Sequence, residues 1–133
     1  MTYDQKKALN PVSLRRPFGA YNHGLIIPPN SSLLVTSGQL GITRDEAIPP
    51  SVTDQAELCF KAIAAILEEA NMSFADVIRI AGFVTRREDF QDYMAVRDRY
   101  TMEPKPVSTL IVVGGFTRAE FLVEVEVTAS KVF

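Results

Sequence analysis

The 133 residues carry a formal net charge of −2, and 47% of them are hydrophobic and 23% charged. These values are ordinary for a soluble globular domain, and they lack the excess of Lys and Arg that nucleic-acid binding requires. One cysteine and one histidine allow no intrachain disulfide and make a zinc site improbable, and no apolar run approaches the roughly 20 residues that span a bilayer. We therefore expect a cytoplasmic protein with no metal, no membrane segment and no nucleic-acid partner.

The N-terminal part is expected to hold an arm and two strands. Residues 1–16 are polar and predict a loosely attached arm, followed by a single domain at 17–133. Within this domain the apolar end of "RPFGAYNHGLII" (16–27) is stopped by two prolines, which remove ladder donors. The stretch "SLLVTSGQLGI" (32–42) predicts a second strand, closed by glycines.

The clearest helix is predicted over 53–72. Its apolar residues recur every three or four positions and form one stripe, and Thr53 or Asp54 could cap its start. Cys59 lies on that stripe, which favours a small buried hydrophobe over a nucleophile.

The second half of the chain alternates strands and a helix. The β-branched run at 76–86 predicts a strand, helical spacing predicts a shorter helix at 87–102, and prolines mark the start of a buried strand at 107–113. The last stretch, 120–133, alternates, so that two sets of side chains occupy opposite faces: Phe121, Val123, Val125 and Val127 on one, Leu122, Glu124, Glu126 and Thr128 on the other.

The resulting order, β-β-α-β-α-β-β, predicts a two-layer α+β sandwich with both helices over one sheet. A sheet covered on one side leaves its other face unexplained. The strand "VSTLIVV" is too apolar for either of its faces to lie in water. Association of copies through the uncovered face is the simplest explanation.

Several polar groups are candidates for chemistry. Glu124 could position water or move protons, although Glu124 and Glu126 also fit a pair of solvated, salt-bridged acids. Tyr21 and His23 lie two apart between glycines and could donate hydrogen bonds on the same side, or His23 could be structural. Arg97 shares the apolar side of its helix and could reach inward.

A backbone site is also indicated at "TSGQLG" (36–41), where N–H groups near Gly38 could approach a ligand closely. This stretch has neither the glycine spacing nor the lysine of a phosphate loop, which disfavours nucleotide binding. The hydroxyls of Ser108 and Thr109, at the mouth of the 107–113 strand, form another candidate site.

Taken in order, "FGAYNHG", "LLVTSGQLG", the helix–strand–helix segment from "QAELCF" to "VRDRY", "KPVST" and "VEVEVTA" resemble the reactive-intermediate deaminase (Rid, or YjgF-type) family over residues 17–131. The resemblance implies a chorismate-mutase-like α+β fold with a mixed sheet, assembled as a homotrimer with clefts between subunits. It also implies a small-molecule substrate and no cofactor, since members hydrolyse reactive enamines and imines to keto acids and ammonia.

The family pattern transfers unevenly to this chain. Tyr21 matches the cleft tyrosine, Glu124 matches the glutamate that holds water, and Ser37 with Gly38 matches the cleft turn. His23 falls where members carry Gln or His. In contrast, Ser108 stands where the family has the arginine that clamps the substrate carboxylate, and Met94 replaces a polar cleft residue.

Losing a bidentate arginine–carboxylate contact removes charge-assisted hydrogen bonds of about 1.5–3 kcal/mol each. A small imino acid is therefore disfavoured as substrate unless Arg97, Lys105 or a neighbouring subunit's arginine reaches the cleft. We expect either a hydrolytic deaminase for a differently anchored imine or enamine, or a non-catalytic, chaperone-like trimer that binds small ligands. Endoribonuclease activity, known in some members, fits the negative net charge poorly.

Overall fold

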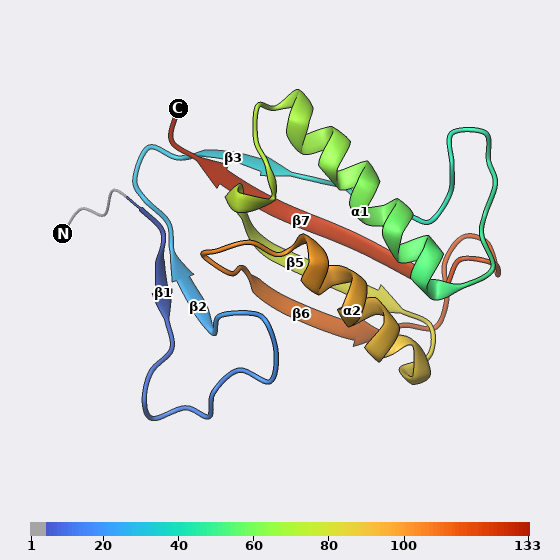
Figure 1. Ribbon diagram of the computed structural model, residues 1–133, viewed down its shortest axis with the longest axis horizontal. Helices are drawn as coiled ribbons and strands as arrows, with labels where there is room; N and C mark the ends of the chain where they lie inside the picture. Colours follow the sequence, from blue (N-terminus) through green and yellow to red (C-terminus); the bar gives the residue numbers. More distant parts are fainter. Residues whose placement is uncertain (1–4) are drawn as a thin grey trace.

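The computed structural model describes residues 5–133, which form a β-sheet layer and a helix layer (Figure 1). The two α-helices are α1 (Val52–Glu69) and α2 (Phe90–Tyr100), and both lie on the same face of the sheet. The sheet strands are β3 (Ser32–Val35), β4 (Gln39–Leu40), β5 (Val77–Val84), β6 (Val107–Val112) and β7 (Val123–Lys131). The predicted two-layer α+β sandwich is confirmed.

The sheet is mixed. Its strand order is β3-β7-β5-β6, and β4 pairs with β7 beside β3. All pairs are antiparallel except β5 with β6, which are parallel. A parallel pair needs a long crossover connection, and α2 supplies it between β5 and β6.

A separate two-stranded ribbon lies beside this sheet. It pairs β1 (Lys7–Leu9) with β2 (Gly24–Ile26) in antiparallel register. The ribbon thus includes part of the predicted arm, whose residues 1–4 lie outside the described residues. The strand expected near 16–27 is only three residues long and belongs to the ribbon, because the preceding residues form a loop instead.

Helix α1 begins earlier than the sequence suggested. Ser51 is its N-cap, and the Ser51 hydroxyl accepts a hydrogen bond from the Asp54 N–H at 3.1 Å. The expected caps, Thr53 and Asp54, instead lie in the first turn. The predicted apolar stripe is buried, and burial raises the pKa of the Cys59 thiol to about 12, so it stays protonated.

The core lies between the helices and one face of β7. Val123 and Val125 are fully buried, and Val127 nearly so. They pack with Ile80 and Val84 of β5 and with α1 side chains. The alternation predicted for β7 is therefore confirmed, and Glu124, Glu126 and Thr128 face away from the helices.

The strand predicted at 32–42 is interrupted. Val35 pairs with Thr128 and Gln39 with Val125, so three residues of the first strand oppose two residues of β7. This is the geometry of a β-bulge, which locally bends a strand and often lies next to a functional site. Thr36 ties the bulge to β7, since the Val127 N–H donates to its hydroxyl at 3.0 Å.

Candidate functional site

Glu124 lies on the uncovered face of β7, directly beneath the bulge. A Cβ atom placed on Gly38 would be 2.4 Å from the Glu124 carboxyl carbon, which no real contact tolerates. Only a glycine at position 38 allows the backbone to approach the carboxylate so closely. The structure thus brings together Ser37–Gly38 and Glu124, which are far apart in the sequence.

The electrostatics of Glu124 favour proton transfer. Partial burial raises the pKa of its carboxyl, and the neighbouring negative charge of Glu126 raises it further. A carboxyl with a raised pKa is a stronger base and is more readily protonated near neutral pH. Of the two glutamates considered from sequence, the structure therefore distinguishes Glu124.

A second cluster forms where α2 meets β6. The Arg97 side chain is only 4% exposed, and its Nη1 donates to the Ser108 hydroxyl at 3.1 Å. Nε and Nη2 of the same guanidinium bind the Asp98 carboxylate at 3.1 and 3.0 Å. The expectation that Arg97 reaches inward is confirmed, and its contact is the residue that stands at the family's arginine position.

Tyr21 and His23 lie in the loop between β1 and β2 and do share one side, with ring centroids 6.3 Å apart. The Tyr21 hydroxyl accepts from the Phe18 N–H at 3.1 Å, which leaves its own O–H free to donate. His23 Nε2 lies 2.6 Å from the Arg15 carbonyl oxygen, so that nitrogen carries the proton and closes the loop. In this geometry His23 contributes structure through Nε2.

Two asparagines hold this loop in place, and neither was among the residues predicted to form the site. Asn22 Nδ2 donates to the Lys105 carbonyl at 2.7 Å, and the Asn22 N–H donates to the Pro106 carbonyl at 3.0 Å. Asn10 Nδ2 donates to Asn22 Oδ1 at 2.8 Å. The loop that carries Tyr21 is therefore attached to the start of β6. The only available signal was an Asn between the two glycines of "GAYNHG".

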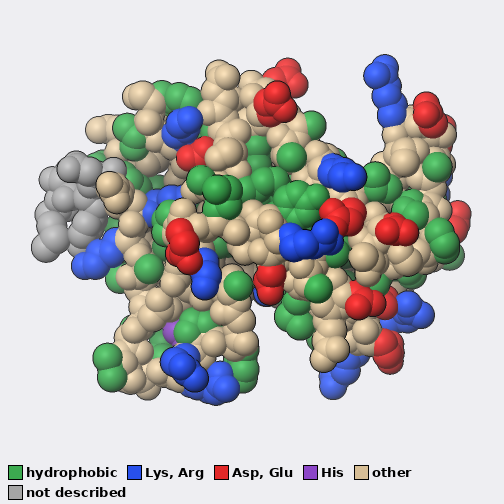
Figure 2. All heavy atoms as spheres, viewed as in Figure 1, with side chains coloured by type: hydrophobic (Ala, Val, Ile, Leu, Met, Phe, Trp, Pro, Cys, Tyr) green, Lys and Arg blue, Asp and Glu red, His purple; other side chains and the backbone are tan. Residues whose placement is uncertain are grey.

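A cavity of about 390 Å³ lies beside this loop, and Tyr21, Arg16 and Lys105 are among its lining residues. Figure 2 shows the molecule hollowed next to the part that carries the histidine, with Lys and Arg side chains at its rim. Gly19 also lines the cavity, and a Cβ on it would be 3.6 Å from Arg97 Nη2. The cavity therefore adjoins the Arg97–Ser108 pair, and its charged lining is Arg16 together with Lys105, whose Nζ lies 3.7 Å from the Glu103 carboxylate.

The two clusters are separated within one chain. Ser108 pairs with Ile80, which pairs with Val127, so Ser108 faces the helix layer. Glu124 faces the opposite side, and β6 and β4 are at opposite edges of the sheet. One chain alone does not place Glu124 and Ser108 in a common cleft.

The remaining candidates divide between these faces. Thr109 follows Ser108 on β6 and is therefore exposed on the uncovered face, with Glu126. Met94 is half-buried and packs against the core from α2.

Among residues 5–133 no His, Cys, Asp or Glu side chains are grouped so that they could hold a metal ion. No helix in the same residues has the length and apolar character to cross a membrane.

The fold and these clusters define a small α+β domain whose polar groups lie at the two edges of a half-covered sheet. The family model described as Endoribonuclease L-PSP matches residues 13–131. The chain belongs to this family, the Rid or YjgF-type proteins.

Individual relatives agree with this assignment. AldR of Lactococcus lactis, whose name refers to a regulator, is 32% identical over 113 residues, covering 84% of this chain and 86% of AldR. The structure of Rid-family YyfB from Yersinia pestis has a TM-score of 0.80 at 18% identity, over 94% of this chain and 98% of YyfB. TdcF of Escherichia coli, solved with bound serine, has a TM-score of 0.69 at 25% identity, over 94% and 98%. The name of TdcF refers to reactive-intermediate deamination.

Proposed function

We propose that this protein is a cofactor-independent hydrolase that converts a reactive imine or enamine into a carbonyl compound and ammonia. The observation that carries the proposal is the Glu124 carboxyl, which has a raised pKa and lies against Gly38 beneath the bulge. Membership of the Rid family and the likeness to TdcF support it.

In this proposal Glu124 takes a proton from water as the water oxygen adds to the imine carbon. The nitrogen receives a proton, the C–N bond of the resulting amino alcohol breaks, and ammonia leaves as the carbonyl forms. An enamine is first protonated on carbon to give the imine. The Tyr21 O–H is a suitable donor to the substrate nitrogen or oxygen.

We propose that the Ser108 hydroxyl binds the substrate while Arg97 donates a hydrogen bond to that hydroxyl. A hydroxyl that accepts a hydrogen bond from a guanidinium is polarised and becomes a better donor. Ser108 therefore offers one strengthened hydrogen bond to a substrate oxygen, whereas the family's arginine offers two charged ones. A neutral carbonyl or amide group suits this anchor better than a free carboxylate.

The complete cleft is proposed to form between two copies of a homotrimer. Glu124, Ser37 and Gly38 would come from one copy, and Tyr21, Arg97 and Ser108 from the next. The separation of these groups within one chain supports this assignment. The uncovered face also exposes apolar side chains that a neighbour could bury, including Leu33 and Val35, which are 65% and 74% exposed.

The chemistry is tested by ammonia release from freshly generated imines, each presented as a free acid and as the matching amide. We expect turnover with preference for the amide, and a loss of about 10²–10⁴-fold in kcat/KM for Glu124→Gln. The matched control is Glu126→Gln, two residues along the same face, which should remain active. Full activity of Glu124→Gln would refute the mechanism.

If no imine is turned over but a panel member raises the melting temperature, the ligand-binding alternative replaces the enzymatic one. The family description also names an endoribonuclease. Unchanged RNA after incubation at low salt would remove that activity, which the net charge of −2 disfavours.

The shared cleft is tested by mixing subunits. Glu124→Gln and Tyr21→Phe proteins, each impaired alone, are unfolded together and refolded as hybrids. If the cleft spans two copies, some clefts regain both groups and activity returns. A cleft contained in one chain predicts no recovery.

A further inference from the structure

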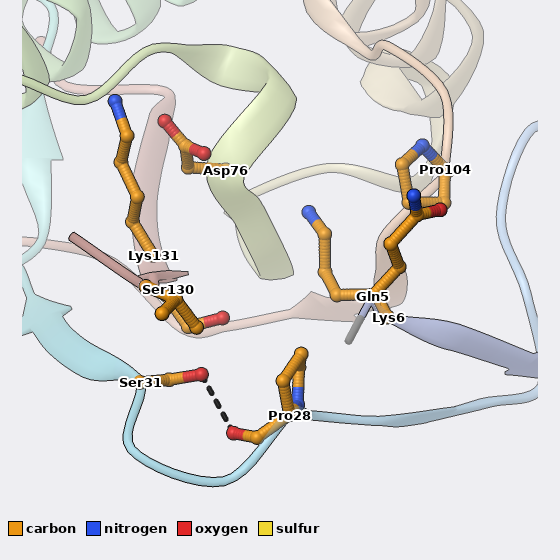
Figure 3. A pocket seen from close by; sticks show the side chains of 9 residues that line it. Gln5, Lys6, Pro28, Ser31, Asp76, Pro104, Ser130 and Lys131 are labelled. Carbon is orange, nitrogen blue, oxygen red and sulfur yellow. Dashed lines mark hydrogen bonds between the residues drawn. The ribbon is translucent and has the colours of Figure 1, made fainter. Parts of the chain in front are cut away.

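A second cavity lies at the other end of β7 from Glu124, about 23 Å away along the strand at the usual rise per residue. Its volume is about 390 Å³, and it is lined by residues from distant parts of the chain (Figure 3): Gln5, Lys6, Pro28, Ser31, Asp76, Pro104, Ser130, Lys131 and Val132. The ribbon, the sheet and the turn before β5 (Phe74–Asp76) all contribute to it. The proposed chemistry uses none of these residues.

Positive charge exceeds negative charge in this cavity. Lys6 and Lys131 contribute two ammonium groups against one carboxylate, that of Asp76. Neither lysine forms an ion pair with a carboxylate of residues 5–133. The Asp76 carboxylate accepts from the Ser73 N–H at 2.8 Å and so is partly occupied in capping its own turn.

The ammonium groups are held in place but retain donors. Lys6 Nζ donates to the Ala75 carbonyl at 2.6 Å, and Lys131 Nζ donates to the Asn71 carbonyl at 2.9 Å and lies 5.2 Å from the Phe133 ring centroid. An ammonium has three N–H donors, so each lysine keeps two for another partner. Burial lowers the pKa of Lys6, and the charge of Asp76 only partly offsets this. A bound anion would supply the missing counter-charge.

Hydroxyl and apolar groups complete the lining. Ser130 is buried, with 4% exposure, and its side chain forms no hydrogen bond within the described residues. The Ser31 hydroxyl donates to the Pro28 carbonyl at 2.7 Å (Figure 3). Pro28, Pro104 and Val132 form an apolar part of the wall. The cavity thus combines cationic, hydroxyl and apolar surfaces.

We propose that this cavity binds a small organic anion, in which a carboxylate or phosphate group meets Lys6 and Ser130 and a short apolar body contacts the prolines. Such a ligand would connect the N-terminal ribbon to the end of β7. It would bind independently of the Glu124 site, so this inference and the proposed hydrolase activity stand or fall separately.

The test is a titration of the full chain followed by NMR amide shifts, with butyrate and inorganic phosphate as anionic probes and butyramide as the neutral match of butyrate. We expect saturable shifts at Ala75 and Ser130 with an anion and none with butyramide. Lys6→Gln should weaken binding at least about tenfold, the loss of one charge-assisted bond, and Lys6→Arg should restore it. Lys61→Gln, an exposed lysine on α1, is the control.

The proposal would be overturned by no saturable shift with either anion, by equal binding of butyramide, or by binding that Lys6→Gln leaves unchanged. A thermal melt shows whether Lys6→Gln is folded, and Ser130→Ala provides a second variant. Shifts confined to Gly38 and Glu124 would place the anion in the other site and would equally overturn it.

Discussion

The two faces of β7 show how one strand serves two purposes. On one face Val123, Val125 and Val127 are buried under the helices, in the hydrophobic core. On the other, Glu124, Glu126 and Thr128 are half-buried, and the raised pKa of Glu124 reflects that partial burial. Stability is concentrated on the covered face, and the uncovered face is free to carry charge and to meet another copy.

The largest expected effect is on the covered face. Phe60 of α1 is fully buried in the core, and Phe60→Ala should lower the free energy of unfolding by about 3–5 kcal/mol through lost burial and the cavity left behind. Urea denaturation measures the change. Glu126→Ala, on the uncovered face, should change it far less; equal losses would end the contrast between the faces.

The next effect is on the proposed chemistry. Gly38→Ala would force the Glu124 carboxylate to move, because the new methyl group would overlap it. A displacement of about 1 Å is enough to lower kcat/KM about 10²-fold. Gly114→Ala is the matched control, since a Cβ there meets nothing within 4 Å. If both variants kept full ammonia release, the close approach at Gly38 would have no catalytic role.

A smaller effect is expected where α2 meets β6. Arg97→Lys keeps the charge but loses the planar fork that bonds Ser108 and Asp98 together. We expect KM to rise about tenfold with kcat little changed, because the polarised hydroxyl is proposed to act in binding. Arg99→Lys, also on α2 but more exposed, is the comparison. A fall in kcat at constant KM would assign Arg97 a different role.

The smallest effect is a pH dependence of stability. The pKa of Glu124 is higher in the folded than in the unfolded chain, so its ionisation disfavours folding, and stability is lost as pH rises through the folded pKa. Glu124→Gln should therefore be more stable than the wild type at pH 7, and this advantage should vanish below the unfolded pKa of about 4.3. Urea midpoints of both proteins across this range measure it. An advantage independent of pH would contradict the burial of the carboxyl.

Some of this structure follows from sequence pattern alone. The stripe of α1 and the alternation in β7 are one-dimensional periodicities, and both were predicted with their facing sides correct. The bulge was not predicted, because "VTSGQL" reads as one strand and only pairing with β7 shows the extra residue. From sequence, Arg97 was only one of several cations that could reach the position of Ser108. The contact could not be predicted because it depends on how α2 is placed over β6.

The bulge also shifts the alternation of inward- and outward-facing side chains by one residue. In an unbroken strand, Val35 and Gln39, four residues apart, would face the same way, but the bulge puts Val35 in register with Thr128 and Gln39 with buried Val125, on opposite faces. Downstream of it, Gly41 packs against Gln55, and a Cβ there would be 2.4 Å from the Gln55 Cβ.

Gln55 in turn holds the residues that precede β7 by hydrogen bonds. Its side chain donates to the Pro49 and Glu120 carbonyls, both at 2.9 Å, and accepts from the Leu122 N–H at 2.8 Å. Deleting a single residue at 36–38 would remove the bulge and leave Gln39 opposite Val125, so β4 would keep its facing while the close approach of Gly38 to the Glu124 carboxylate would be lost. The extra residue thus places Gly38 over Glu124 without disturbing the contact of Gly41 with Gln55.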